Sequence, residues 1–158
     1  MDPGGVEAGF LGNHTWTRKR NAHQAAFEAL PLGCAGTLPT SPIPVPQYAL
    51  QGTYRTANNQ PATALLLRFA NAVSAAAYRT GYQARMTACG SGGNLAVDRL
   101  WSTTTAAASL PRYAGGEPYI DVPLANGSTV ALLAAAVPAV ENPSAWAHSV
   151  VPALEAVI

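Results

Sequence analysis

Charged residues are scarce in this chain. Asp, Glu, Lys and Arg make up 11% of its 158 residues, against about a quarter in an average soluble domain. Lys19 is the one lysine, and the formal net charge is +1. A domain that binds nucleic acid normally presents a strongly basic face. We therefore expect no nucleic-acid partner.

Long apolar runs are also missing, although 49% of the residues are hydrophobic. Much of that share is alanine, which is spread along the whole chain. A membrane-spanning helix needs about 20 consecutive, predominantly apolar residues, and no stretch approaches that length. The sequence therefore predicts no transmembrane segment.

The two cysteines, Cys34 and Cys89, allow one disulfide or two free thiols. Both lie beside glycine, and no cluster of His or Cys accompanies them as a zinc site would require. We expect a bridge, which would stabilise the fold by about 4 kcal/mol because it closes a long loop. A bridge implies an oxidising compartment. We therefore expect an extracellular or cell-envelope location, after removal of a signal sequence that this chain does not contain.

The first half of the chain shows strand and helix periods in turn. Tyr48–Thr56 alternates in the manner of a half-exposed strand, and 62–69 contains a run of three leucines that fits a strand covered on both faces. A long helix is expected from Asn71 or Ser74, either of which suits a helix N-cap, to Cys89.

Tyr78 and Tyr82 lie four residues apart and therefore fall on one stripe of this helix. We expect both to be mostly buried in the core, together with Val73 of the helix and Leu66 and Phe69 before it.

The second half is expected to add three strands and a last helix. Residues 95–110 are predicted to form one long strand. Asn-Gly at 126–127 predicts a hairpin between 119–125 and 128–137, because a type I′ turn needs positive φ at both central positions. Ser144 is the expected cap of the last helix.

The order of these elements predicts an α+β fold. We expect a mostly antiparallel sheet of about five strands, with the helices packed on one face and one disulfide. Residues 1–33 are expected to form a flexible N-terminal segment with a short helix at 21–30, and residues 34–158 a single domain.

The middle of the chain combines an apolar strand ending in Phe, an alanine-rich helix and a Cys-Gly pair: Leu65–Phe69, then 72–88 with Tyr78 and Tyr82, then Cys89-Gly90. This combination resembles the extracellular sensor domains of PknH-like mycobacterial serine/threonine kinases and related actinobacterial lipoproteins. In those domains an earlier cysteine is bridged to that position, which Cys34 matches. The resemblance covers about residues 34–158. It implies an extracellular binding or sensing role and no kinase activity.

The candidate binding residues are Tyr54, Trp101, Arg112 and Tyr113, all on expected strands or at their ends. Aromatic rings and guanidinium groups on a concave sheet face suit anionic or sugar-like ligands. Ordinary amphipathic strand packing is the alternative interpretation. No cofactor and no metal site is expected.

No catalytic residue is expected, because no nucleophile has the neighbours that would activate it. Asp98 and Asp121 are the two acids to consider. In an apolar pocket, one of them would have a raised pKa and could act as a base, as in small cone-shaped isomerases and cyclases. The simpler interpretation places both on the sheet surface, paired with Arg99 or Arg112.

We therefore predict a secreted or cell-envelope module that binds or senses a ligand without catalysis. Its partner would be a small molecule or an envelope protein. The alternatives are an accessory structural subunit of an envelope assembly and a small cone-fold isomerase or cyclase. A buried Asp in an apolar pocket would favour the enzyme, and a wide exposed apolar patch would favour the structural subunit.

Overall fold

The computed structural model describes residues 14–30, 43–55, 61–88, 95–113, 115–136 and 142–155. Cys34 and Cys89 lie outside these ranges, and no disulfide is found among the described residues, so the predicted bridge stays a prediction. The predicted boundary between the N-terminal segment and the domain, at residue 33, also lies outside the described ranges. None of the helices in the described ranges is long and apolar enough to cross a membrane.

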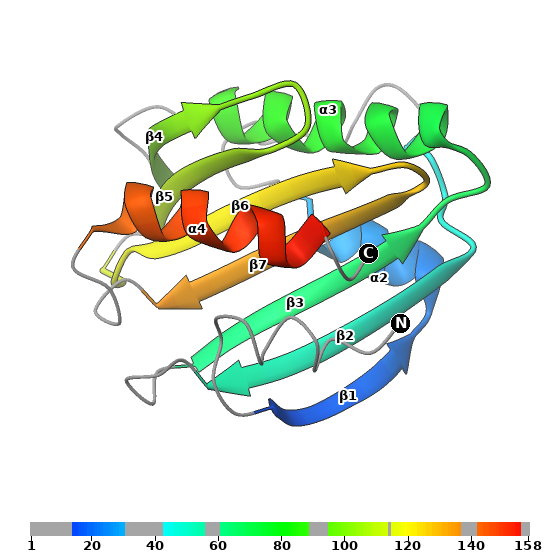
Figure 1. Ribbon diagram of the computed structural model, residues 1–158, viewed down its shortest axis with the longest axis horizontal. Coiled ribbons are helices and arrows are strands. Elements are labelled where there is room, and N and C mark those ends of the chain that lie inside the picture. Colours follow the sequence, from blue (N-terminus) through cyan, green and yellow to red (C-terminus); the bar gives the residue numbers. More distant parts are fainter. Residues whose placement is uncertain are drawn as a thin grey trace.

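Seven strands and three helices form in the described part of the chain (Figure 1). In chain order they are β1 (His14–Arg20), α2 (Ala22–Glu28), β2 (Tyr48–Arg55), β3 (Pro61–Arg68), α3 (Ala72–Ala88), β4 (Leu95–Ser102), β5 (Ala107–Tyr113), β6 (Tyr119–Asn126), β7 (Thr129–Ala136) and α4 (Pro143–Glu155). The strands make one sheet in the order β1-β2-β3-β7-β6-β5-β4, and every neighbouring pair is antiparallel. The α+β class and the antiparallel sheet are thereby confirmed.

The expected number of five strands is wrong, for two reasons. The segment His14–Arg20 pairs with β2 as an edge strand, where no strand was expected. The stretch 95–110 is not one strand, because the chain reverses after Ser102 and returns as β5. At the reversal, the amide of Ala106 donates to Thr103 Oγ1 (3.1 Å) and the amide of Thr103 donates to the carbonyl of Ala106 (2.8 Å). Threonine hydroxyls can replace ladder partners in this way.

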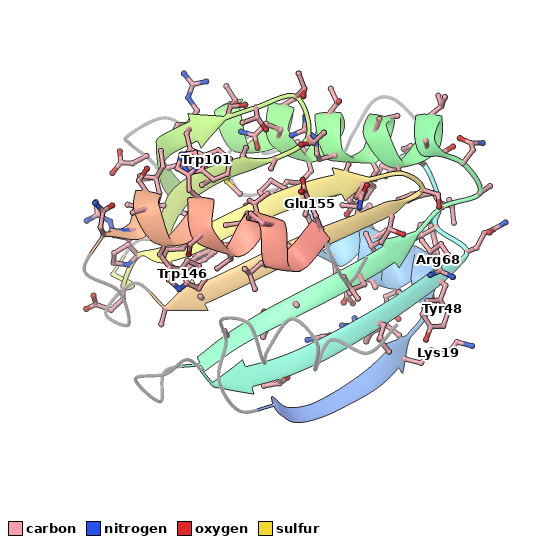
Figure 2. All side chains as sticks on the ribbon, in the orientation of Figure 1. Lys19, Tyr48, Arg68, Trp101, Trp146 and Glu155 are labelled. Carbon is pink, nitrogen blue, oxygen red and sulfur yellow. The ribbon has the colours of Figure 1, made fainter. Side chains whose placement is uncertain are left out.

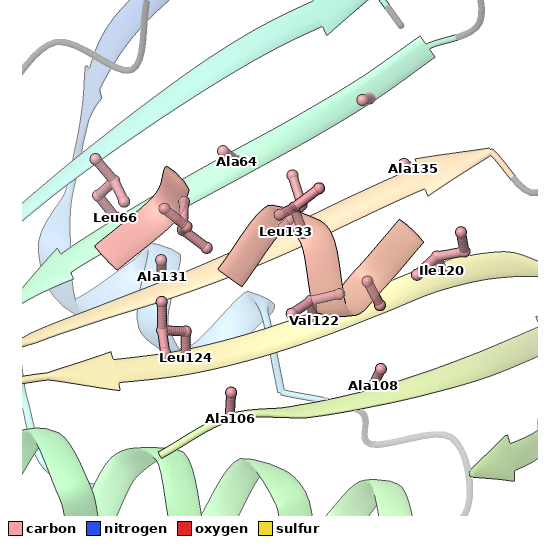
Figure 3. Packing of buried hydrophobic residues seen from close by; sticks show 14 of the residues in the cluster. Ala64, Leu66, Ala106, Ala108, Ile120, Val122, Leu124, Ala131, Leu133 and Ala135 are labelled. Atoms are coloured by element: carbon pink, nitrogen blue, oxygen red, sulfur yellow. The ribbon is translucent and has the colours of Figure 1, made fainter. Parts of the chain in front are cut away.

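Helices cover both faces of the sheet, which corrects the prediction that they share one face. Leu66, Leu133 and Val122 pack in the same cluster as α4 (Figure 3). Leu67 and Leu132, their neighbours in sequence, pack on the opposite face with α2 and α3. Successive strand residues point to opposite faces, so the leucine run of β3 needs cover on both sides. That double cover was predicted for Leu65–Leu67, and it is present.

Each described helix begins at an asparagine cap. The side-chain oxygens of Asn21, Asn71 and Asn142 each accept from the backbone amide three residues later, at 2.9, 2.9 and 3.1 Å. Capping of this kind satisfies an amide that has no partner within the helix. Asn71 is one of the two caps expected for α3, whereas Ser144 lies inside α4 and is not its cap.

Backbone pairing between neighbouring strands is continuous in some parts of the sheet and sparse in others. The β6–β7 hairpin runs without interruption from Tyr119–Ala136 to Asn126–Thr129, so its two turn residues are Gly127, with φ 59°, and Ser128. The predicted hairpin is confirmed, but its turn lies one residue later than the predicted Asn126-Gly127 pair. Between β5 and β6, the described residues pair at Ser109–Asp121 and at the bridge Ala106–Leu124. The amide of Ala125 donates to the carbonyl of Thr105 (2.9 Å). Pro123 lies two residues earlier and therefore faces the same neighbour, but it has no amide hydrogen to donate.

Candidate functional site

A cavity of about 280 Å³ lies on the face of the sheet that α2 and α3 cover. Its apolar lining includes Ala25 of α2, Ala29 at the C-terminal cap of that helix, Leu65 of β3, and Leu132 and Ala134 of β7. Alanines on the helix and on the strand leave space where larger side chains would fill the layer. The polar lining comes from six elements: Arg20 of β1, Glu28 of α2, Gln51 of β2, Thr63 of β3, Tyr82 of α3, and Tyr119 and Asp121 of β6.

Asp121 is the most unusual residue of this lining. Its side chain is 4% exposed. Oδ1 accepts a hydrogen bond from the hydroxyl of Tyr82 (2.7 Å), while Oδ2 has no hydrogen-bond partner in the part of the chain that the structure describes. Burial raises the pKa of Asp121 from 3.8 to about 7, against the smaller, opposing effect of the hydrogen bond from Tyr82. A carboxyl in this position changes its protonation state near neutral pH.

The interpretation of Asp121 as a sheet-surface residue is therefore wrong. It faces the layer below α3, directly opposite Ala134 on β7 and Ser109 on β5. Asp98 is exposed, as expected, on β4. The two acids are separated by β5 and do not share a cavity.

Two tyrosines stand beside the carboxyl. Tyr82 is 5% exposed, and burial followed by the charge of Asp121 raises its pKa well above the usual value. Tyr119 is partly buried, and its pKa is raised by the same causes and by a hydrogen bond with Tyr113. Both phenols therefore stay neutral at physiological pH and act as hydrogen-bonding groups.

An ion pair stands at the rim of the cavity. Arg20 Nη2 contacts Glu28 Oε2 at 2.6 Å, with the side chains 20% and 51% exposed. Arg20 Nη1 donates to Gln51 Oε1 as well, and Gln24 Nε2 donates to Glu28 Oε1 (2.8 Å). These contacts tie β1 to β2 and α2. They also engage the guanidinium with partners other than Asp121.

The four binding residues expected from the sequence do not lie together. Tyr54 is on β2 and Trp101 on β4, so four strands of the sheet separate them. Trp101 packs beside α4 (Figure 2), where it stacks on His148 with ring centroids 4.1 Å apart and donates to the carbonyl of Ser144 (3.3 Å). These contacts are those of a residue that fixes α4 to the sheet.

Arg112 and Tyr113 are exposed at the end of β5 that pairs with the start of β4. Alternation directs them to opposite faces of the sheet. Tyr113 is the one of the four with a described connection to the cavity, through its hydrogen bond with Tyr119.

Sequence reasoning missed the residues that line the cavity. Tyr82 was assigned to the buried helix stripe, and it is indeed buried, but its hydroxyl was not considered. Asp121 carried a usable signal, since it is a single charge between Ile120 and Val122 in an apolar strand. No sequence signal connected Arg20 or Glu28 to this site, because their contacts depend on the pairing of β1 with β2.

The site combines the Asp121 carboxyl, which has a near-neutral pKa, with two neutral phenols and an ion pair at the rim of the cavity. Such a site can bind a small polar molecule or exchange a proton with it. Among the described residues there is no group of three or more His, Cys, Asp or Glu able to hold a metal ion.

The extracellular domain of PknH from Mycobacterium tuberculosis has a solved structure that matches this chain with a TM-score of 0.58 and 14% identity. The match covers 96% of this chain and 90% of that domain. The resemblance expected from the sequence is thus confirmed for the fold. No family model and no curated protein matches the chain.

Proposed function

We propose that this protein is a ligand-binding, sensor-like module outside the cell or in the cell envelope, and that it binds a small molecule in the cavity beside Asp121. The observation that carries the proposal is that Asp121, a residue of the cavity lining, has a buried Oδ2 with no hydrogen-bond partner among the described residues. The extracellular location is supported by the shared fold with a sensor domain.

An unpartnered buried carboxyl oxygen destabilises a folded protein. A buried polar group without its hydrogen bond costs about 1–3 kcal/mol, and more if it is charged. Native structures contain few such groups, and each of them requires an explanation. A ligand that supplies the missing hydrogen bond explains both the group and the empty volume next to it.

A cavity-filling substitution tests whether this is the ligand site. A fragment library should shift amide resonances of cavity residues in ¹H–¹⁵N spectra, and Ala134→Leu should abolish those shifts because the larger side chain occupies the cavity. Ala76→Leu is the matched control, since Ala76 is exposed on α3. If no fragment shifts the cavity residues, or if Ala134→Leu leaves the shifts unchanged, the site is wrongly assigned.

A second candidate function is general acid–base catalysis by Asp121, the cone-fold isomerase or cyclase alternative. It is favoured by one observation, the pKa of about 7 of this enclosed carboxyl, which suits a catalytic base near neutral pH. Exchange of the α-protons of cyclohexanone in D₂O provides a test. Exchange that the protein accelerates and that Asp121→Asn abolishes would support the enzyme, and its absence would support the binding module.

The accessory structural subunit remains a hypothesis without a specific observation in its favour. The described large apolar side chains that are exposed include Phe27 on α2, Val73 on α3 and Tyr113 on β5. Apolar residues that are exposed one at a time are common on monomeric proteins and need no partner.

A further inference from the structure

We infer that the ligand of the cavity carries an ammonium group, or an equivalent cationic N–H donor, that is held by Oδ2 of Asp121. The inference rests on the proposed function, since it names the chemical class of the molecule that would occupy the same site. It follows from the hydrogen-bonding capacity and the charges of the side chains that surround the carboxyl.

The hydrogen-bonding groups around Asp121 leave one position vacant. The hydroxyl of Tyr82 has a single hydrogen, which it donates to Oδ1 (2.7 Å). Oδ2 has no hydrogen-bond partner among the residues that the structure describes. In the ionised form of Asp121 both oxygens only accept hydrogen bonds, so the ligand group that completes the site of the carboxylate is a donor. A ligand whose polar atoms are all acceptors cannot satisfy the carboxylate.

The surrounding charges indicate that this donor is cationic. Titratable groups line the cavity together with the carboxyl from four elements: Arg20 of β1, Glu28 of α2, Tyr82 of α3 and Tyr119 of β6. Tyr113 of β5 lies beside Tyr119. The three tyrosines carry no positive charge, and the guanidinium of Arg20 is engaged by Glu28 and Gln51. Within the described ranges the carboxylate therefore has no free countercharge, and a buried carboxylate is stabilised most by an opposite charge that also donates a hydrogen bond.

An anionic ligand is disfavoured for the same reason, because it would meet both Asp121 and Glu28. The remainder of the lining suits an apolar body, since Leu65, Leu132 and Ala25 form much of it. A cavity of about 280 Å³ holds a molecule of modest size. The ligand class that fits the cavity is therefore a small primary amine with an apolar hydrocarbon group.

This class predicts how binding depends on pH. An ammonium group pairs with the ionised form of Asp121, so binding must release the proton that the free carboxyl retains below a pKa of about 7. The ionised fraction rises about 20-fold between pH 5.5 and pH 7.5 for such a group. Amine affinity should rise by about the same factor over this interval and then level off.

Three probes of similar shape test the inference: benzylamine, benzyl alcohol and benzoate. Each would be titrated into ¹⁵N-labelled protein at pH 5.5 and 7.5, with the shifts of cavity amides as the readout. Benzylamine should bind most tightly and about 20-fold better at the higher pH. Asp121→Asn should weaken benzylamine at least tenfold at pH 7.5 and remove its pH dependence. Asp98→Asn, which alters an exposed acid outside the cavity, should change neither.

The inference is overturned if benzyl alcohol or benzoate binds the cavity as tightly as benzylamine, or if Asp121→Asn leaves benzylamine binding unchanged. If benzylamine does not bind while other library fragments shift the cavity residues, the inference of an ammonium ligand is overturned but the proposed function is not. If no fragment of any charge shifts those residues, the proposed function fails together with it.

Discussion

Replacing Asp121 by asparagine should change how the stability of the domain depends on pH. The folded carboxyl has a pKa of about 7, against 3.8 for its ordinary value, because it is buried. Between these two values, the unfolded chain has lost the proton while the folded protein keeps it. The free energy of unfolding therefore falls as pH rises across this interval, and it levels off above it.

The size of this change in stability follows from the difference between the two pKa values of Asp121. At about 1.4 kcal/mol for each unit of pKa, a difference between 3.8 and about 7 corresponds to about 4 kcal/mol. An asparagine does not titrate, and its side-chain oxygen can still accept from Tyr82. The difference in unfolding free energy, wild type minus Asp121→Asn, should therefore fall by about 4 kcal/mol between pH 4 and pH 8.

Urea unfolding followed by tryptophan fluorescence would measure this difference at several pH values from 4 to 8. Asp98→Asn controls for the removal of an acid in general, because its side chain is exposed on β4. A difference between wild type and Asp121→Asn that stays constant with pH would refute the burial of a titrating carboxyl. The proposed ligand site would then lose the buried, titrating carboxyl that predicts its pH dependence.

Three other outcomes are expected. Tyr82→Ala should lower the free energy of unfolding by about 3 kcal/mol or more in urea melts, because Tyr82 is 5% exposed. Val73→Ala should lower it by less than about 0.5 kcal/mol, because Val73 is 80% exposed. Equal losses would contradict the assignment of the buried face of the helix. Gly127→Ala should lower the unfolding free energy by about 1–2 kcal/mol, since Gly127 has φ 59°, and an unchanged melting midpoint would argue against that turn. Mapping of non-reduced peptides should find Cys34 linked to Cys89, and two free thiols would remove the argument from the cysteines for an oxidising compartment.

The central part of the fold was predictable because its residues carry strong periodic signals. The leucines of β3, the Asn-Gly turn at 126–127 and the helix stripe with Tyr78 and Tyr82 each led to the correct element. Val73 was expected in the core and is exposed, because it precedes the stripe that faces the sheet.

The edges of the sheet were not predictable in the same way. β1 contains Arg18-Lys19-Arg20, and a polar edge strand has no clear apolar face to reveal it. The turn after Ser102 is built from threonines, which strands also favour. The site itself was missed because a cavity depends on which strands become neighbours. Asp121 and Arg20 are far apart in sequence and line one cavity only because β7 lies between β3 and β6.

The sparse pairing of β5 with β6 divides the sheet into units of different cooperativity. Local opening follows the boundaries between regions that share few hydrogen bonds, and here that boundary lies beside Pro123. The amides of β4 and β5 should therefore exchange with deuterium before those of β3 and β7. Opening of this hairpin would separate Ser109 from Asp121 and expose the carboxyl to water. Local opening of the β4–β5 hairpin, and not global unfolding, would then set the rate at which the buried carboxyl of Asp121 exchanges protons with solvent.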